Sequence, residues 1–217
     1  MSADAASFIR ANTAIDAPPL VPEIRLHLAG EITPLWQATE TALEREQLPP
    51  PYWAFAWAGG QALARHVLDH PGLVRGKRVL DFGAGGGLLA LAAARAGAAE
   101  AVAAEIDPFA AAAIGLNAAL NGLAVAVESA DVIGRFPVPW QVVLAGDMCY
   151  ERPLAERLTR WLRHLAGAGV LVLLGDPGRA YLPREELEEL ARYRVPTPLE
   201  LEDRTMREGV VWQLGGS

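Results

Sequence analysis

Short apolar runs alternate with longer alanine-rich stretches along the chain from residue 77 onward. The short runs predict five strands, at 78–82, 101–105, 125–128, 141–145 and 169–174. The longer stretches predict helices, at 86–96, 107–122, 153–166 and 182–193. Two further short segments are predicted to pair as a closing antiparallel hairpin, at 194–197 and 210–214. The alternation predicts an α/β fold with a mostly parallel sheet and helices on both faces.

The region before residue 77 has a weaker pattern. Residues 23–28 alternate polar and apolar side chains, which predicts a short edge strand or an extended lead-in. Residues 34–46 have weak helical character that ends at a run of three prolines, and residues 54–68 predict a helix with one apolar face. The first 20 residues, which end at Pro18 and Pro19, predict a loose arm.

The length of 217 residues suits one generous domain, and neither an internal repeat nor a linker divides the chain. We therefore predict an arm over 1–21 and a single domain over 22–217, in which 22–76 form the lead-in and 77–217 the core. No apolar run approaches the ~18–20 residues of a membrane helix, and the N-terminus lacks a signal-peptide pattern. With one cysteine, Cys149, we expect a cytoplasmic protein that does not bind membranes.

The charge of the chain narrows the class of partner. The formal net charge is −7, from 26 acidic and 19 basic residues. A nucleic-acid surface usually needs a basic stripe, so we expect no nucleic-acid partner. The acidity favours a cationic partner such as a lysine-bearing protein segment, although its commoner role is to maintain solubility. We expect a monomer.

A glycine motif follows the first predicted strand and opens the next helix. Its glycines are Gly83, Gly85 and Gly87, and Leu88 stands where a dinucleotide-binding motif would need its third glycine. Glycines let a backbone turn sharply and approach a ligand closely. Asp81, two residues before the first glycine, would repel a pyrophosphate but would attract a sulfonium and an α-ammonium group. The motif therefore favours S-adenosylmethionine over NAD, although Asp81 is alternatively a turn-capping acid.

Further acidic residues end or follow the next two predicted strands. Glu105 stands 22 residues beyond Gly83, close to the ~20-residue spacing of an acid that binds ribose hydroxyls. Asp107 is a weaker candidate, because an acid before proline often caps a helix. Asp131 is predicted to accept a hydrogen bond from the adenine amino group, with Val132 beside the ring, and an ordinary loop acid is an equally weighted alternative.

Asp147 and Tyr150 follow the fourth predicted strand, after an apolar run. Transfer of a methyl group from a sulfonium requires an aligned and unprotonated nucleophile. A lysine amine has a reference pKa of ~10.4 and needs desolvation or a proton acceptor before it can attack. Asp147 and the Tyr150 hydroxyl are predicted to hold such an amine. The alternatives are a helix cap for Asp147 and an aromatic wall for Tyr150.

The remaining candidates are less specific. Asp176 and Arg179 follow the fifth strand in an Asp-Pro-Gly-Arg segment, which is either an ordinary turn or a rim that meets the substrate. Trp57 precedes two glycines, which suits a ligand wall, although such aromatic residues more often belong to a core. His66 and His70 have an i, i+4 spacing that can bind zinc, but without further ligands such histidines are usually solvated. We expect no metal site.

The chain resembles the class I, seven-stranded S-adenosylmethionine-dependent protein methyltransferases. More narrowly, it is similar to the lysine methyltransferases of the electron transfer flavoprotein β-subunit. The resemblance runs from about residue 22 to the C-terminus and rests on residues 22–28, 51–63, 79–85, 106–108, 146–150 and 175–179. Many methyltransferases share the glycine motif, whereas the Trp-rich segment and the Asp-Pro-Gly-Arg turn are narrower signals. Glu105 departs from the aspartate that many relatives carry.

The resemblance implies a Rossmann-like sheet and a protein-lysine N-methyltransferase that converts S-adenosylmethionine to S-adenosylhomocysteine. An Asp-x-x-Tyr motif after the fourth strand is associated with lysine targets in the wider group, and Asp147 and Tyr150 fit it. The alternatives are methylation of another protein, as in ribosomal-protein methyltransferases, or of a small molecule, as in nicotinamide N-methyltransferase. The full set of cofactor-binding candidates is Trp57, Asp81, Gly83, Gly85, Gly87, Glu105, Ile106, Asp131, Val132 and Gly146.

Overall fold

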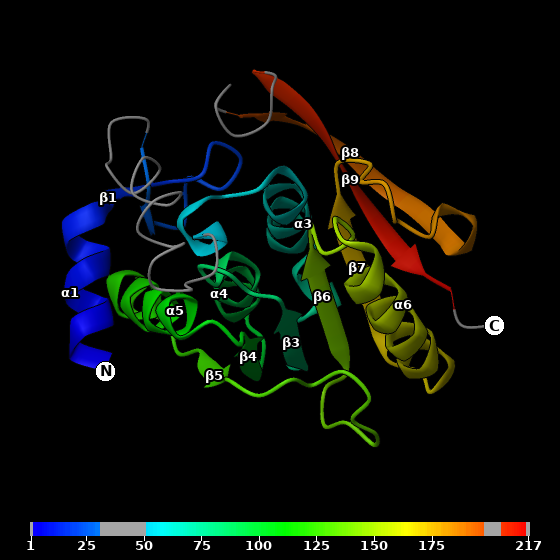
Figure 1. Cartoon of the computed structure of the whole chain (residues 1–217). Coiled ribbons are helices and arrows are strands. Elements are labelled where there is room, and N and C mark those ends of the chain that lie inside the picture. The colour runs from blue at the N-terminus through cyan, green and yellow to red at the C-terminus, as the bar shows by residue number, and fades with distance from the viewer. Residues whose placement is uncertain (1, 31–50, 198–204, 216–217) are drawn as a thin grey trace.

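The computed structural model describes residues 2–30, 51–197 and 205–215, so the helix predicted over 34–46 lies outside the described residues. Seven strands of the described part form one sheet in the order β5-β4-β3-β6-β7-β9-β8 (Figure 1). Their bounds are β3 Arg78–Phe82, β4 Glu100–Ala104, β5 Ala126–Glu128, β6 Val142–Gly146, β7 Leu171–Asp176, β8 Leu187–Pro196 and β9 Met206–Leu214. Strands β3 to β7 are parallel and β9 is antiparallel to both of its neighbours. The predicted Rossmann-like sheet is confirmed.

Helices cover both faces of the sheet (Figure 1). The helices of the described part are α1 Ser2–Asn12, α3 Ala58–Asp69, α4 Leu88–Arg95, α5 Pro108–Asn121 and α6 Arg152–Gly167. Val79 and Val142 of the central strands pack with α3 and α4, whereas the next residues, Leu80 and Val143, pack with α6. Because side chains along a strand alternate between the two faces, consecutive apolar residues supply both halves of the core.

Turn residues set the helix bounds where the sequence predicts them. Gly87 precedes α4 with φ of 84° and Gly122 follows α5 with φ of 63°, a backbone region that other residues rarely adopt. The Asp107 carboxylate accepts the Phe109 N–H at 2.8 Å, so this residue caps α5 ahead of Pro108. The capping alternative for Asp107 is therefore confirmed.

The helix predicted over 182–193 is wrong. A short 3₁₀ turn, Arg184–Glu186, leads instead into strand β8, which pairs with β9 from Leu187 to Pro196. Apolar spacing in this segment also fits a helix, but the β9 backbone supplies a ladder of hydrogen bonds that a local pattern does not reveal. The closing hairpin is consequently longer than the one predicted from 194–197 and 210–214.

The N-terminal segment is folded where a loose arm is predicted. Ile9 of α1 is fully buried, and the Phe8 and Phe109 rings lie 5.3 Å apart between α1 and α5. Strand β1 (Ala14–Asp16) pairs with β2 (Leu26–Leu28) antiparallel, which agrees with an extended segment near residues 23–28. Among the described residues, no helix has the length and apolar character to span a membrane.

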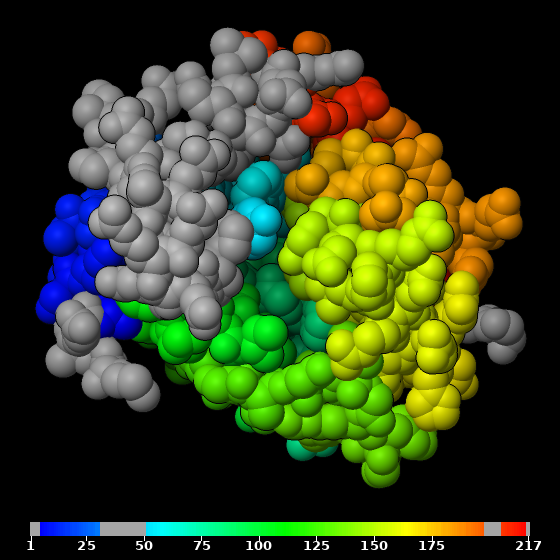
Figure 2. All heavy atoms as spheres, viewed as in Figure 1, coloured from blue at the N-terminus to red at the C-terminus, as the bar shows by residue number. Residues whose placement is uncertain are grey.

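The parallel strands end level with one another at the edge that carries the candidate site. Phe82 is in register with both Ala104 and Ala145, and Gly146 is in register with Gly175. Figure 2 shows a hollow on this face, between the cyan segment after residue 51 and the yellow-green segment near residue 150. Ligands of open α/β sheets bind outside these carboxyl ends.

Candidate active site

The glycine loop between β3 and α4 depends on left-handed backbone conformations. Gly83, Gly85 and Gly87 have φ of 63°, 52° and 84°. A Cβ on Gly83 would stand 2.4 Å from the sulfur of Met148, and one on Gly87 would stand 3.1 Å from Ile114. The loop therefore has both the conformations and the close packing that only glycine allows.

Asp81 is the penultimate residue of β3, just before this loop, and is 1% exposed. One carboxylate oxygen, Oδ2, accepts the Ala90 N–H of α4 at 2.9 Å. The other, Oδ1, is buried without a hydrogen-bond partner in the described part of the chain. Burial raises the pKa of Asp81 to about 7, and the charge of Glu105 adds to that rise. Asp81 thus anchors the first turn of α4, and its second oxygen can bind a ligand donor.

Glu105 links the end of β4 to the glycine loop. Its Oε2 accepts the Gly85 N–H at 2.9 Å and its Oε1 accepts the Asp107 N–H at 3.0 Å. Burial raises its pKa, while these two backbone donors oppose the rise. A carboxylate has about four acceptor positions, so Glu105 keeps capacity for ligand hydroxyl groups.

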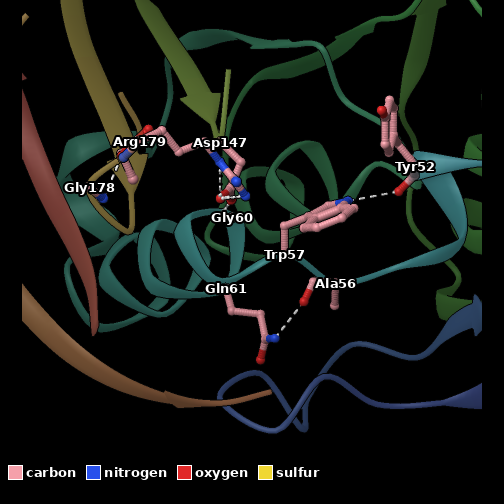
Figure 3. Close-up of polar contacts among 9 residues, drawn as sticks. Tyr52, Ala56, Trp57, Gly60, Gln61, Asp147, Gly178 and Arg179 are labelled. Carbon is pink, nitrogen blue, oxygen red and sulfur yellow. Dashed lines mark hydrogen bonds and ion pairs between the residues drawn. The ribbon is translucent and has the colours of Figure 1, made fainter. Parts of the chain in front are cut away.

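Asp147 follows β6 in a left-handed conformation, with φ of 59°, and is 7% exposed. This conformation is uncommon outside glycine, although aspartate tolerates it better than most residues. The Asp147 Oδ2 accepts the Gly60 N–H at 2.7 Å (Figure 3), near the N-terminus of α3, where the helix dipole favours negative charge. Burial raises the pKa of Asp147 to about 6, the Arg179 charge lowers it, and the Asp176 charge raises it. The alternative that Asp147 caps the following helix is wrong, because Glu151 occupies the N-cap of α6.

Arg179 brings the Asp-Pro-Gly-Arg turn to Asp147. Its Nη2 and Nε donate to the Asp147 Oδ1 at 2.7 and 3.2 Å. The Asp176 Oδ1 accepts the N–H groups of Gly178 and Arg179, each at 2.7 Å, and this confirms the turn. The Arg179 guanidinium lies 5.5 Å from the centre of the Trp57 ring.

Aromatic side chains border this cluster. The Tyr52 ring lies 5.9 Å from both the Trp57 and the Tyr150 ring, and the Trp57 Nε1 donates to the Tyr52 carbonyl at 3.0 Å. Tyr150 is 43% exposed, and desolvation raises the pKa of its hydroxyl. Tyr150 therefore lies at the open side of the site, and its role in methyl transfer stays a prediction.

The residues predicted for the adenine end are more dispersed. The exposed Asp131 accepts the Ile133 N–H at 2.9 Å and pairs with Arg157 at 2.9 Å. Both contacts lower the pKa of Asp131, and the backbone hydrogen bond from Ile133 has the larger effect. Val132 is 1% exposed, whereas Ile106 is 73% exposed beside Glu105. The structure does not bring Asp131 into contact with the Asp147 cluster, and its ligand role stays a prediction.

Close glycine contacts place α3 against the strand ends. Gly146 and the two glycines after Trp57 are predicted from the sequence to approach a ligand, and their packing against one another is not predicted. A Cβ on Gly59 would lie 2.2 Å from the Gly175 oxygen, and one on Gly146 would lie 2.9 Å from the Gly60 Cα. The Gly-Gly pair after Trp57 and the glycines that end β6 and β7 are the available signal. These contacts allow the Gly60 N–H to reach Asp147.

Two other side chains, Cys149 and His66, are buried outside the predicted site. Cys149 is 1% exposed, and burial raises the pKa of its thiol to about 12, so it is not a reactive thiolate. His66 is buried beside the Tyr193 hydroxyl, 3.2 Å from its Nδ1, rather than solvated as expected. Within the described residues, no three His, Cys, Asp or Glu side chains are grouped to hold a metal ion.

Comparison with known proteins identifies the family. The chain is 40% identical over 215 residues to the electron transfer flavoprotein beta subunit lysine methyltransferase of Xenopus laevis, across 95% of this chain and 85% of that protein. The protein of the same name from Homo sapiens is 36% identical over 216 residues, across 95% of this chain and 80% of its own length. The chain belongs to this lysine methyltransferase family. It is accordingly a methyltransferase.

More distant similarities agree with the fold. The family profile of ribosomal protein L11 methyltransferase matches residues 63–147, which include the glycine loop and Asp147. A putative RNA methyltransferase from Pyrococcus horikoshii superposes with a TM-score of 0.56 and 17% identity, over 83% of this chain and 99% of that one. The ribosomal protein L11 methylase of Lactobacillus delbrueckii gives 0.52 and 20%, over 74% and 81%. Magnesium protoporphyrin IX methyltransferase from Synechocystis, solved with bound S-adenosylmethionine, gives 0.51 and 16%, over 82% and 93%.

Proposed function

We propose that this chain is an S-adenosylmethionine-dependent protein-lysine N-methyltransferase whose substrate is the electron transfer flavoprotein β-subunit. The observation that carries the proposal is the position of Asp147. A carboxylate with a strained backbone, held by Gly60 and Arg179, stands at the same sheet edge as the glycine loop. The names of the relatives, at 36–40% identity, support the choice of substrate.

The residues around the glycine loop fit the cofactor. The unpartnered Oδ1 of Asp81 is a buried acceptor that an ammonium group or a water bound to it would satisfy. The left-handed glycines shape the loop after Asp81, and a Cβ on Gly83 or Gly87 would collide with Met148 or Ile114 and displace that loop. We assign Asp81 to the amino-acid end of the cofactor and Glu105 to its ribose, with Asp131 and Val132 at the adenine. When bound, S-adenosylmethionine supplies the electrophilic methyl group.

The protein's own contribution is to bind and orient the acceptor amine. The Asp147 carboxylate binds the amine of the lysine and orients its lone pair, and the Tyr150 hydroxyl offers a second polar contact at the open side. Aromatic rings lie beside the path by which a lysine would reach Asp147, and they belong to Tyr52, Trp57 and Tyr150. Aromatic faces attract a cationic side chain. Methyl transfer requires the neutral amine, so the bound ammonium first releases one proton to solvent at the open side of the site. Partial burial lowers the pKa of the lysine and so favours this loss.

The experiment is methylation of purified, unmodified β-subunit with methyl-labelled cofactor. We expect label on lysine, as located by mass spectrometry, and a loss of at least about 100-fold in kcat/KM for Asp147→Asn with unchanged S-adenosylhomocysteine affinity. Ribosomal protein L11 and nicotinamide serve as competing substrates. Label on either of these, with none on the β-subunit, would replace the proposed substrate and leave the methyltransferase assignment intact.

A Tyr150→Phe variant separates the two interpretations of Tyr150. If the hydroxyl holds the amine, kcat falls about tenfold or more, whereas an aromatic wall leaves kcat within about twofold. Tyr181→Phe is the matched control, because this exposed tyrosine stacks on Arg152 at 5.3 Å outside the Asp147 cluster.

We also propose that the protein acts as a cytoplasmic monomer without a nucleic-acid or membrane partner. The single cysteine supports the compartment, and the net charge of −7 supports the lack of a nucleic-acid partner. Sedimentation of the purified protein tests the monomeric state. Fractionation of cells that express a tagged chain tests the cytoplasmic location. A stable dimer, or recovery in a membrane fraction, would contradict the corresponding part.

A further inference from the structure

Both carboxylate oxygens of Asp147 are already occupied by the protein's own donors. Oδ2 accepts the Gly60 N–H at 2.7 Å, and Oδ1 accepts two N–H groups of the Arg179 guanidinium at 2.7 and 3.2 Å (Figure 3). The Asp147 side chain is 7% exposed to solvent, whereas the Arg179 side chain is 20% exposed. A lysine that approaches from solvent therefore meets Arg179 before it meets Asp147.

Contacts with Asp176 and Trp57 fix the position of Arg179. The Asp176 carboxylate accepts the backbone N–H groups of Gly178 and Arg179 and so fixes the start of the side chain. The guanidinium lies over the Trp57 ring, 5.5 Å from its centre. A carboxylate on one side and an aromatic face on the other make a site for a cation, and an alkylammonium group suits the same two surfaces.

We propose that Arg179 occupies, in the substrate-free protein, the cation position on Asp147 that the substrate lysine takes, so that lysine binds by exchange with arginine. This inference rests on the proposed function and assigns Arg179 as a positioning residue. The exchange keeps the buried Asp147 charge paired before and after lysine binds, which avoids the cost of an isolated buried carboxylate. It also restricts access to Asp147 to groups that can replace a guanidinium.

The charges around Asp147 allow the exchange. Asp176 and Cys149 are the other titratable groups that interact with it, and the first turn of α3 contributes the Gly60 N–H and no acidic residue. Asp176 interacts with Arg184 as well as with Arg179, so its charge stays compensated when Arg179 moves. The position that becomes available to a lysine is therefore the one on Asp147. Arg179 can leave Asp147 and remain close to Asp176, whose Oδ2 is buried without a partner in the described residues.

The kinetic test compares Arg179→Gln with Arg152→Gln at saturating cofactor. Arg152 is the matched control, since it also stacks on an aromatic ring, that of Tyr181, whereas the arginine that pairs with Asp147 is Arg179. At pH 8 to 9, Arg179→Gln should lower KM for the lysine substrate about tenfold with kcat within about twofold, because lysine no longer competes with a guanidinium. Arg179→Lys retains a positive charge and should keep KM within about threefold of the original value.

The pH profile gives a readout that a purely structural role would not move. Arg179 lowers the pKa of Asp147, so its removal should shift the acid limb of kcat/KM to higher pH. A higher KM in Arg179→Gln would mean that Arg179 grips the substrate, and an unchanged KM would mean that it does not occupy the lysine position. Either result overturns the inference, provided that the thermal unfolding of the variant shows a folded protein.

A cofactor-free measurement separates failure of the inference from failure of the proposed function. The Nε–H of Arg179 should give a nitrogen-15 NMR signal, assigned by its absence in Arg179→Lys. Titration with Nα-acetyl-lysine amide should displace that signal and leave the Arg152 signal in place. A signal that does not respond in an enzyme that methylates lysine overturns the exchange alone. A protein that methylates no lysine overturns the proposed function, whatever the signal does.

Discussion

The carboxylate of Asp81 accepts the Ala90 N–H at 2.9 Å through one oxygen, while its other oxygen is buried without a partner among the described residues. Burial raises the pKa of Asp81 from its ordinary value of 3.8 to about 7 in the folded protein. Between these two pH values the folded state binds a proton that the unfolded chain has released. The stability that Asp81 contributes is therefore present below about pH 3.8 and is lost as the pH rises through about 7.

Replacement of Asp81 by Asn should remove this pH dependence, because the amide keeps a hydrogen-bond acceptor for Ala90 and carries no charge. The free energy of unfolding of Asp81→Asn relative to the original protein should rise between pH 5 and pH 8, by at most about 1.4 kcal/mol per pH unit. Urea unfolding at these pH values measures it. Calorimetry should show S-adenosylhomocysteine binding weakened at least about tenfold, and unchanged affinity would remove Asp81 from the cofactor site.

Gly83 and Gly122 share a φ of 63° but differ in their surroundings. A Cβ on Gly83 would lie 2.4 Å from the Met148 sulfur, whereas nothing lies within 4 Å of one on Gly122. Alanine at either position should cost about 1–2 kcal/mol of stability from the left-handed backbone. Gly83→Ala alone should also weaken S-adenosylhomocysteine binding in calorimetry, since Met148 is displaced within the cofactor loop. Equal affinity in the two variants would contradict a cofactor role for this loop.

Gly59 and Gly60 are consecutive residues of α3 with opposite expected tolerance. A Cβ on Gly59 would stand 2.2 Å from the backbone oxygen of Gly175, whereas one on Gly60 would first meet Asp147 at 3.9 Å. Gly59→Ala should lower the free energy of unfolding by about 1–3 kcal/mol or more, because backbone atoms must move. Gly60→Ala should be neutral or raise it by about 0.5–1 kcal/mol. Urea unfolding of the pair decides the matter, and equal effects would refute the close packing of α3 on β7.

The fall of kcat/KM at low pH should follow the protonation of Asp147. At saturating cofactor, kcat/KM for the protein substrate should fall about tenfold per pH unit below about pH 6, because protonated Asp147 no longer attracts the amine. Asp176→Asn removes a negative charge that raises the Asp147 pKa, so the limb should move to lower pH. The control is Asp69→Asn, whose aspartate pairs with Arg65 at 2.8 Å on α3. A limb that stays in place in Asp176→Asn would assign it to another group.

Much of the site follows from local sequence. The glycines at 83–87 and the apolar run before them specify the turn and the buried strand, because both depend on backbone torsions and the solvation of adjacent residues. Asp81, Glu105 and Asp147 lie at strand ends by the same reasoning, since parallel strands end at one edge. The sequence therefore predicts that these three acids lie at the same edge of the sheet.

The chain by itself determined the parallel core, its glycine loop and the acids at its edge. Only the tertiary structure decided that 187–196 is a strand, because its hydrogen-bond partners lie on β9. It also decided that Asp147 is held by Arg179, 32 residues away, and by Gly60, 87 residues away. Such contacts depend on how distant segments pack, and a local pattern of apolar and polar residues carries no information about which donor reaches which carboxylate.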